Sequence, residues 1–85
     1  MSCSAVTYHG VNQKVFDCLK SSLEKAGIKV PDAHSGTISG HGIKADFKWD
    51  GSDALWIKVT DKPFIISCSY ITGKIHDAVH GCGGQ

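Results

Sequence analysis

Hydrophobic and polar residues alternate strictly over two neighbouring stretches of the chain. From Ile43 to Asp50 every second residue is apolar, and the residues between them are lysine or aspartate. After a short turn, Leu55 to Thr60 continues the same pattern. Because successive side chains of a strand point to opposite faces, this alternation predicts two strands of a sheet with one buried face and one charged face.

The same parity predicts how the strands pair at the first turn. If His41 and Gly42 are the two residues of a tight turn, Ile38 lies opposite Ala45. Both side chains then point to the buried face, as the hydrophobic pattern requires. We therefore expect a short strand before His41 that forms a hairpin with the alternating stretch.

The second turn, around 50–53, must contain an odd number of residues to keep Leu55 on the buried face. A turn of five residues pairs Asp46 with Lys58, whereas a turn of three sets Lys44 against Lys58. Opposite charges on facing residues stabilise a sheet and like charges destabilise it. The sequence therefore favours the five-residue turn.

Two segments show the spacing of amphipathic helices. Apolar residues recur every three or four positions over 11–26, and Gly27 follows as a left-handed helix end. A second helix is expected to begin after Ser67 or Ser69 as N-cap and to end at Gly81. Both helices carry one apolar stripe, so both should cover the buried face of the sheet.

Together these elements predict a single α+β domain over residues 1–85. We expect a two-layer sandwich in the order helix, three-stranded antiparallel meander, short extended segment, helix. The extended segment is Phe64 to Ile66, which we expect to be buried. Residues 1–8 and 82–85 are expected to be flexible tails.

The number and distribution of charged residues limit the kinds of molecule that the protein is expected to bind. The formal net charge is +1, and the basic residues are nine lysines spread along the chain without any arginine. Phosphate and base recognition depends on a basic patch and often on the arginine fork, so nucleic acid is disfavoured. The first nine residues lack the basic and apolar regions of a secretory signal, and no stretch is long enough for a membrane helix. We therefore expect a soluble, cytoplasmic protein without a membrane partner.

Four cysteines lie at wide, irregular spacings with no Cys-x-x-Cys pair, which is a poor pattern for zinc or redox chemistry. We expect free thiols, with Cys18 inside the first helix as a small hydrophobic residue. Cys3 and Cys82 fall in the expected tails. No pattern in the sequence requires a cofactor.

A weak metal pattern is present on the second helix. His76 and His80 are four residues apart and share one helix face, and Cys82 follows two residues later. Imidazole and thiolate are ligands that zinc accepts. Histidines in the last turn of a helix also stabilise its negative end when charged, by about 0.3 to 1 kcal/mol each, and this structural explanation accounts for the pattern without a metal.

Two further patterns have structural explanations that we prefer. Cys68 lies near the start of the second helix, where its thiol could become nucleophilic, but it also falls on the apolar stripe and has no base nearby in sequence. The glycine-rich segment 35–42 could offer backbone N–H groups to a phosphate, but a strand follows it where a phosphate loop would open a helix. Neither pattern establishes an enzyme.

Trp56 is a large hydrophobic residue whose position in the sequence does not fit the buried core. Alternation places its side chain on the charged face of the sheet, among Lys44, Lys48 and Lys58. A partly exposed indole can cover lysine side chains or anchor an interface. We therefore expect a non-catalytic interaction module that could form a homodimer through this face, with metal binding at His76 and His80, or a thiol enzyme using Cys68, as alternatives.

Overall fold

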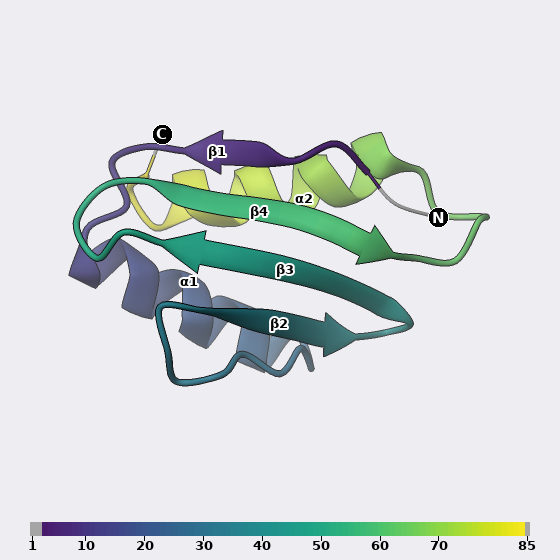
Figure 1. Ribbon diagram of the computed structural model, residues 1–85, viewed down its shortest axis with the longest axis horizontal. Coiled ribbons are helices and arrows are strands. Elements are labelled where there is room, and N and C mark those ends of the chain that lie inside the picture. The colour runs from purple at the N-terminus through teal and green to yellow at the C-terminus, as the bar shows by residue number, and fades with distance from the viewer. Residues whose placement is uncertain (1–2, 85) are drawn as a thin grey trace.

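The computed structural model describes residues 3–84, which form one antiparallel sheet and two helices (Figure 1). The sheet order is β1-β4-β3-β2, and both helices lie on the same face of the sheet. The fold is therefore an α+β two-layer sandwich, as the sequence predicts. The elements in chain order are β1 (Val6–Tyr8), α1 (Gln13–Lys25), β2 (Ser35–Gly40), β3 (Ile43–Trp49), β4 (Leu55–Asp61) and α2 (Cys68–Gly81).

Both hairpin registers are confirmed. Ile38 pairs with Ala45 across the turn at His41 and Gly42, where both turn residues have positive φ, of 54° and 77°. A two-residue turn of this kind needs positive φ at both positions, and Gly42 supplies it without steric cost. In the second hairpin Asp46 pairs with Lys58, as the five-residue turn requires.

The helix ends follow the expected capping chemistry. The Asn12 side chain accepts a hydrogen bond from the Val15 backbone N–H at 2.9 Å and caps the start of α1. Ser67, rather than Ser69, caps α2, and its Oγ accepts from the Tyr70 backbone N–H at 3.1 Å. Gly27 follows α1 with a φ of +85°, the left-handed conformation predicted for it.

Trp49 is part of the core and lies between α1 and the sheet. Its indole stacks on the Phe16 ring with centroids 4.1 Å apart. Trp49 Nε1 donates a hydrogen bond to the Val11 carbonyl oxygen at 2.7 Å, so the polar atom of this buried side chain has a partner. The alternating residues of β3 and β4 complete the core from the sheet side.

The chain before α1 and after α2 contains structure that the sequence analysis missed. Residues 3–8 and 82–84 were expected to be flexible tails, yet Val6–Tyr8 forms strand β1 against β4, with Val6 opposite Ile57. Gly84 is buried, and its N–H donates to the Val79 carbonyl oxygen at 2.9 Å. A three-residue strand is too short to show a periodic pattern, and its pairing with β4 is a long-range contact.

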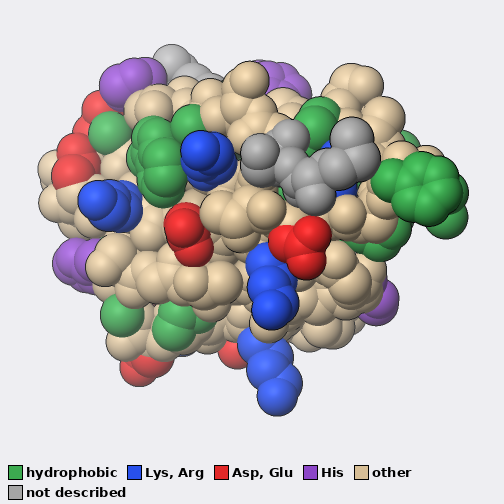
Figure 2. Space-filling view, turned by 45° about the vertical axis from the view of Figure 1, so that its right-hand side comes forward, with side chains coloured by type: hydrophobic (Ala, Val, Ile, Leu, Met, Phe, Trp, Pro, Cys, Tyr) green, Lys and Arg blue, Asp and Glu red, His purple; other side chains and the backbone are tan. Residues whose placement is uncertain are grey.

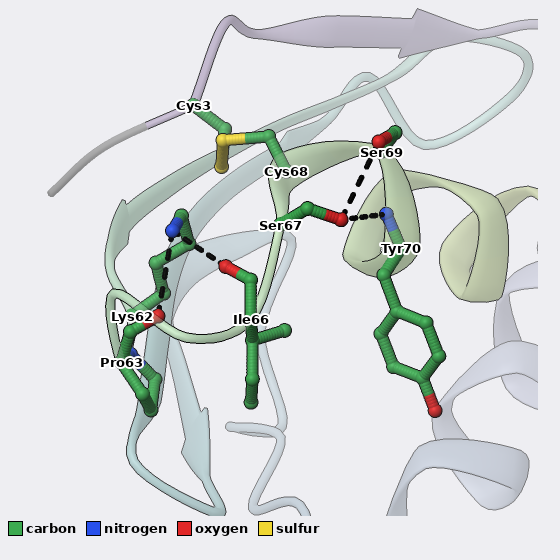
Figure 3. The surroundings of a disulfide bond; sticks show 8 residues. All are labelled: Cys3, Lys62, Pro63, Ile66, Ser67, Cys68, Ser69 and Tyr70. Atoms are coloured by element: carbon green, nitrogen blue, oxygen red, sulfur yellow. Dashed lines mark hydrogen bonds between the residues drawn. A yellow bond between two sulfur atoms is a disulfide. The ribbon is translucent and has the colours of Figure 1, made fainter.

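The connection between β4 and α2 also differs from the prediction. Phe64 and Ile65 were expected to be buried and extended, but they stand in a turn and are 81% and 80% exposed. Figure 3 shows how the turn is held: Lys62 Nζ donates to the carbonyl oxygen of Ile66 at 2.6 Å and to that of Pro63 at 3.4 Å. Figure 2 shows hydrophobic side chains projecting at the end of the molecule to which this turn belongs.

All four cysteines are paired, so the expectation of free thiols is wrong. Cys3 is bonded to Cys68 at the start of α2, with Cα atoms 5.6 Å apart (Figure 3). Cys18 in α1 is bonded to Cys82 just after α2, with Cα atoms 5.7 Å apart. Each bridge joins residues more than 60 positions apart, which is why the spacing of the cysteines does not reveal the pairing.

Candidate functional site

An apolar groove of about 480 Å³ lies between the two helices, above the sheet face that they cover. Small-molecule sites have volumes of roughly 300 to 1,000 Å³ and mostly apolar linings. The floor of the groove comes from three neighbouring strands, so its shape is fixed by the sheet. The floor residues are Ile38 of β2, Ile43 and Ala45 of β3, and Val59 of β4.

The walls of the groove are formed by the two helices. Leu23 of α1 and Ala26, the residue directly after this helix, form one wall. Helix α2 contributes Ile71, Ile75 and Ala78 to the other wall. The three α2 residues recur at intervals of four and three, so they form one stripe of the helix. This stripe, which sequence analysis interprets as core, lines an open space over part of its length.

The disulfide Cys18–Cys82 shows where the helices approach each other. It joins the middle of α1 to the residue after α2. The groove residues of α1 lie beyond this point, toward its C-terminus, and those of α2 lie before it. Because the helices run in opposite directions (Figure 1), they are tied together at one end of the groove and separated along it.

Among the described residues, six of the ten partly buried hydrophobic residues that pack against the core line this groove. Such side chains retain apolar surface that would gain roughly 25 cal/mol per Å² if it were removed from water. The fold leaves this surface in one concavity, where a ligand of suitable shape would cover it. The half-buried hydrophobic residues that line the groove are Leu23, Ile28, Ile43, Ile66, Ile75 and Ala78.

The rim of the groove carries the polar groups. Lys74 and Tyr70 lie one turn apart on α2, and Lys74 Nζ is 5.6 Å from the centroid of the Tyr70 ring. His41, in the turn between β2 and β3, donates from Nε2 to the Ala26 carbonyl oxygen at 2.6 Å. Among the described residues that line the groove there is no aspartate or glutamate. The rim is therefore basic.

Trp56 lies where alternation places it, on the sheet face that the helices leave open. It is half-buried, opposite Lys48 of β3 on one side and Thr7 of β1 on the other. Lys44, Lys48 and Lys58 are exposed. Figure 2 shows lysine and aspartate side chains interspersed over this part of the surface. The predicted residues share one face, and none of them lines the groove between the helices.

The two histidines of the predicted metal site lie side by side, but Cys82 is in a disulfide and cannot bind a metal together with them. The His76 and His80 rings are exposed, with centroids 4.3 Å apart, and the Tyr8 ring lies 6.2 Å from that of His76. Cys82 is bonded to Cys18 and offers no thiolate in this state. Within residues 3–84, no group of three or more metal-ligating side chains is clustered. Metal binding by the histidines alone stays a prediction.

The other two patterns of the sequence analysis have structural roles. Cys68 is bonded to Cys3, so it has no free thiol to act as a nucleophile. The glycine-rich segment forms β2 and its turn, as expected. Gly40 is needed there because a Cβ at this position would lie 3.0 Å from the Gly27 carbonyl oxygen and from the Ile28 Cα.

Comparisons with known proteins find no match to a family model, to a curated protein or to a solved structure. None of the helices described over residues 3–84 has the length and apolar character needed to span a membrane. The groove is therefore interpreted from its geometry and chemistry. Sequence analysis missed it because a groove-lining stripe and a core-packing stripe have the same helical periodicity.

Proposed function

We propose that the protein is a non-catalytic binding module that holds a small molecule with a mainly apolar body in the groove between α1 and α2. The observation that carries this proposal is the groove itself, with a volume of about 480 Å³ and a floor and walls of aliphatic side chains. Its aliphatic lining offers a ligand burial of apolar surface, and the polar groups at its rim can orient the ligand.

We further propose that the protein works in an oxidising compartment, in place of the cytoplasm expected from the sequence. All four cysteines are paired in two disulfides. Stable structural disulfides are rare in the cytosol of mesophilic cells and common in secreted and periplasmic proteins. Disulfides also suit a chain of 85 residues, because a small domain buries a limited core.

The binding proposal is tested by measuring the uptake of dodecanol, a neutral molecule with one aliphatic chain, by isothermal titration calorimetry. We expect saturable binding of one molecule per chain. Ala78→Phe, which adds a ring to the wall of the groove, should weaken this binding at least tenfold. Ala33→Phe is the matched control, because Ala33 is exposed in the loop before β2 and does not line the groove.

Thermal unfolding of both variants shows whether they retain the fold. If folded Ala78→Phe binds dodecanol as tightly as the unchanged protein, the groove is not the site. If the unchanged protein takes up no dodecanol, the proposed function is wrong. Should Ala78→Phe fail to fold, Ala26→Phe on the opposite wall replaces it with the same expected loss.

Self-association through the open sheet face is a second candidate function. It is favoured by the position of Trp56, which is half-buried on a face that neither helix covers. Aromatic residues are enriched at interface centres. Sedimentation velocity at high concentration should show a dimer that Trp56→Ala dissociates and Lys14→Ala on α1 leaves intact. A monomer at every concentration would reject this candidate.

A further inference from the structure

We propose that the ligand of the groove is a single-chain amphiphile with an anionic head, such as a fatty carboxylate, whose head group pairs with Lys74. This inference rests on the proposed function, because it specifies the ligand of the same groove. It is carried by the distribution of charge around the groove. Lys74 and His41 are the basic residues of the lining, and no acidic residue is present among the described lining residues.

The polarity of the groove separates into two zones. The floor is aliphatic, and its side chains come from β2, β3 and β4. The polar groups of α2, Tyr70 and Lys74, lie on the rim and are exposed. A wholly apolar ligand would leave the rim groups without a role in recognition. A molecule with one polar end and one long apolar part matches both zones.

The rim favours an anion over a cation. Lys74 is exposed, and its ammonium group lies 5.6 Å from the centre of the Tyr70 ring. Lysine side chains can lay their methylene groups along apolar surface and keep the ammonium group in water, so Lys74 can follow a head group at the mouth. A cationic head would meet this like charge without an acidic group of the lining to balance it.

His41 fixes the opposite side of the mouth. Its Nε2 donates to the Ala26 carbonyl oxygen at 2.6 Å, which ties the turn between β2 and β3 to the end of α1. Pro63 packs against the same turn, since a Cβ added at Gly42 would be 3.4 Å from Pro63 Cγ. This side of the rim is therefore held by contacts with the end of α1 and with the connection between β4 and α2, and Lys74 is the adjustable charged group of the rim.

The test compares three molecules with the same aliphatic chain and different heads: dodecanoate, dodecanol and dodecyltrimethylammonium. Each is titrated into the oxidised protein at low salt, below the concentration at which it forms micelles. Lys74→Gln should weaken dodecanoate binding about fivefold, since an exposed ion pair contributes up to about 1 kcal/mol. It should leave dodecanol binding unchanged and strengthen dodecyltrimethylammonium binding. Lys14→Gln, which makes the same change of net charge on α1 away from the groove, should alter none of the three.

The outcomes separate this inference from the proposed function. The effect of Lys74→Gln on dodecanoate binding can be compared with its effect on dodecanol binding and with the effect of Lys14→Gln on dodecanoate binding. If dodecanol binds and the first effect is no larger than either of the other two, the groove is a binding site and the proposed anionic head is wrong. If none of the three molecules binds, both proposals fail. If none binds and the protein sediments as a dimer that Ala78→Phe dissociates and Trp56→Ala leaves intact, a second copy is the occupant of the groove, and both proposals are again overturned.

Discussion

The two tryptophans show how alternation along a strand assigns different roles to the same side chain. Trp49 lies on the inner face, is 5% exposed and pairs its indole N–H with the Val11 carbonyl oxygen. Trp56 lies on the outer face and is half-buried. The strand positions of both residues could be predicted from parity alone. The hydrogen bond of Trp49 could not, because Val11 is 38 residues away in the sequence.

The tryptophans give a matched pair of stability predictions. Trp49→Phe removes the hydrogen bond donor of a buried carbonyl oxygen and part of a stacked ring, so the free energy of unfolding should fall by about 2 to 4 kcal/mol. Trp56→Phe should change it by less than about 1 kcal/mol. Urea unfolding followed by circular dichroism checks both values. Equal losses of unfolding free energy in the two variants would contradict the difference in burial between Trp49 and Trp56.

We expect Asp50 to make the stability of the fold depend on pH in acid. Its carboxylate accepts hydrogen bonds from the backbone N–H groups of Ser52, Asp53 and Ala54, at 2.9, 2.7 and 3.1 Å. These bonds favour the charged form and hold the pKa of Asp50 below its ordinary value. A hydrogen bond with the His9 side chain and one from the Gly10 N–H lower the pKa of Asp53 in the same way.

A pKa that is lower in the folded state makes stability fall with acidification. The contribution of Asp50 is complete at pH values above the ordinary aspartate pKa of about 3.9 and is lost as the pH falls through its folded value. The contribution of Asp50 and Asp53 to the melting temperature should therefore be nearly constant from about pH 7 to pH 5. Below about pH 4 the melting temperature should decrease. Asp50→Asn should reduce this decrease, and the exposed Asp77→Asn should leave it in place. An acid decrease that Asp50→Asn does not alter would contradict this assignment.

At the scale of elements, the sequence predicts the parts of the fold that depend on local pattern. The hairpin of β3 and β4, its five-residue turn and the extents of both helices follow from parity and helical spacing. Strand β1, the turn containing Phe64 and both disulfides depend on contacts between distant segments. The site was missed for the same reason, because a groove exists only once α1 and α2 are placed relative to each other.

Helix α2 is the element that depends most on the disulfides. Ile71 and Val79 are the only residues of this helix that are buried, while Cys3–Cys68 and Cys18–Cys82 tie its two ends. In the chain-entropy model, closing a loop of this size stabilises the folded state by about 4 kcal/mol. This is a large share of the roughly 4 to 13 kcal/mol expected for a chain of this length.

Removing either bridge should therefore lower stability strongly. The double variants Cys3→Ser with Cys68→Ser, and Cys18→Ser with Cys82→Ser, should each lose about 3 to 4 kcal/mol in urea unfolding. Mass spectrometry of an unreduced digest should recover the pairs 3–68 and 18–82. Four free thiols in protein purified without reductant, or a different pairing, would contradict the structure.

At the scale of the whole molecule, the sheet has two faces of different character. The outer face carries charged side chains around Trp56, and the inner face carries the core and, where the helices separate, the groove. The core lies mainly between α1 and the sheet, and the groove lies where α1 ends and α2 begins. A binding function for this domain is therefore expected on the inner face, between elements that the disulfides hold in place.

The isoleucines allow the central claim, that the groove is a ligand site, to be tested in one measurement. Isoleucine methyl NMR spectra recorded during a titration with dodecanoate should shift the methyl signals of the isoleucines that line the groove. The signals of Ile57, on the sheet beneath α1, and of the exposed Ile65 should stay in place, and they serve as internal controls. The isoleucines expected to shift are Ile28, Ile38, Ile43, Ile66, Ile71 and Ile75. Uniform shifts of all isoleucines, shifts confined to Ile65, or no shift at saturating dodecanoate would contradict the claim.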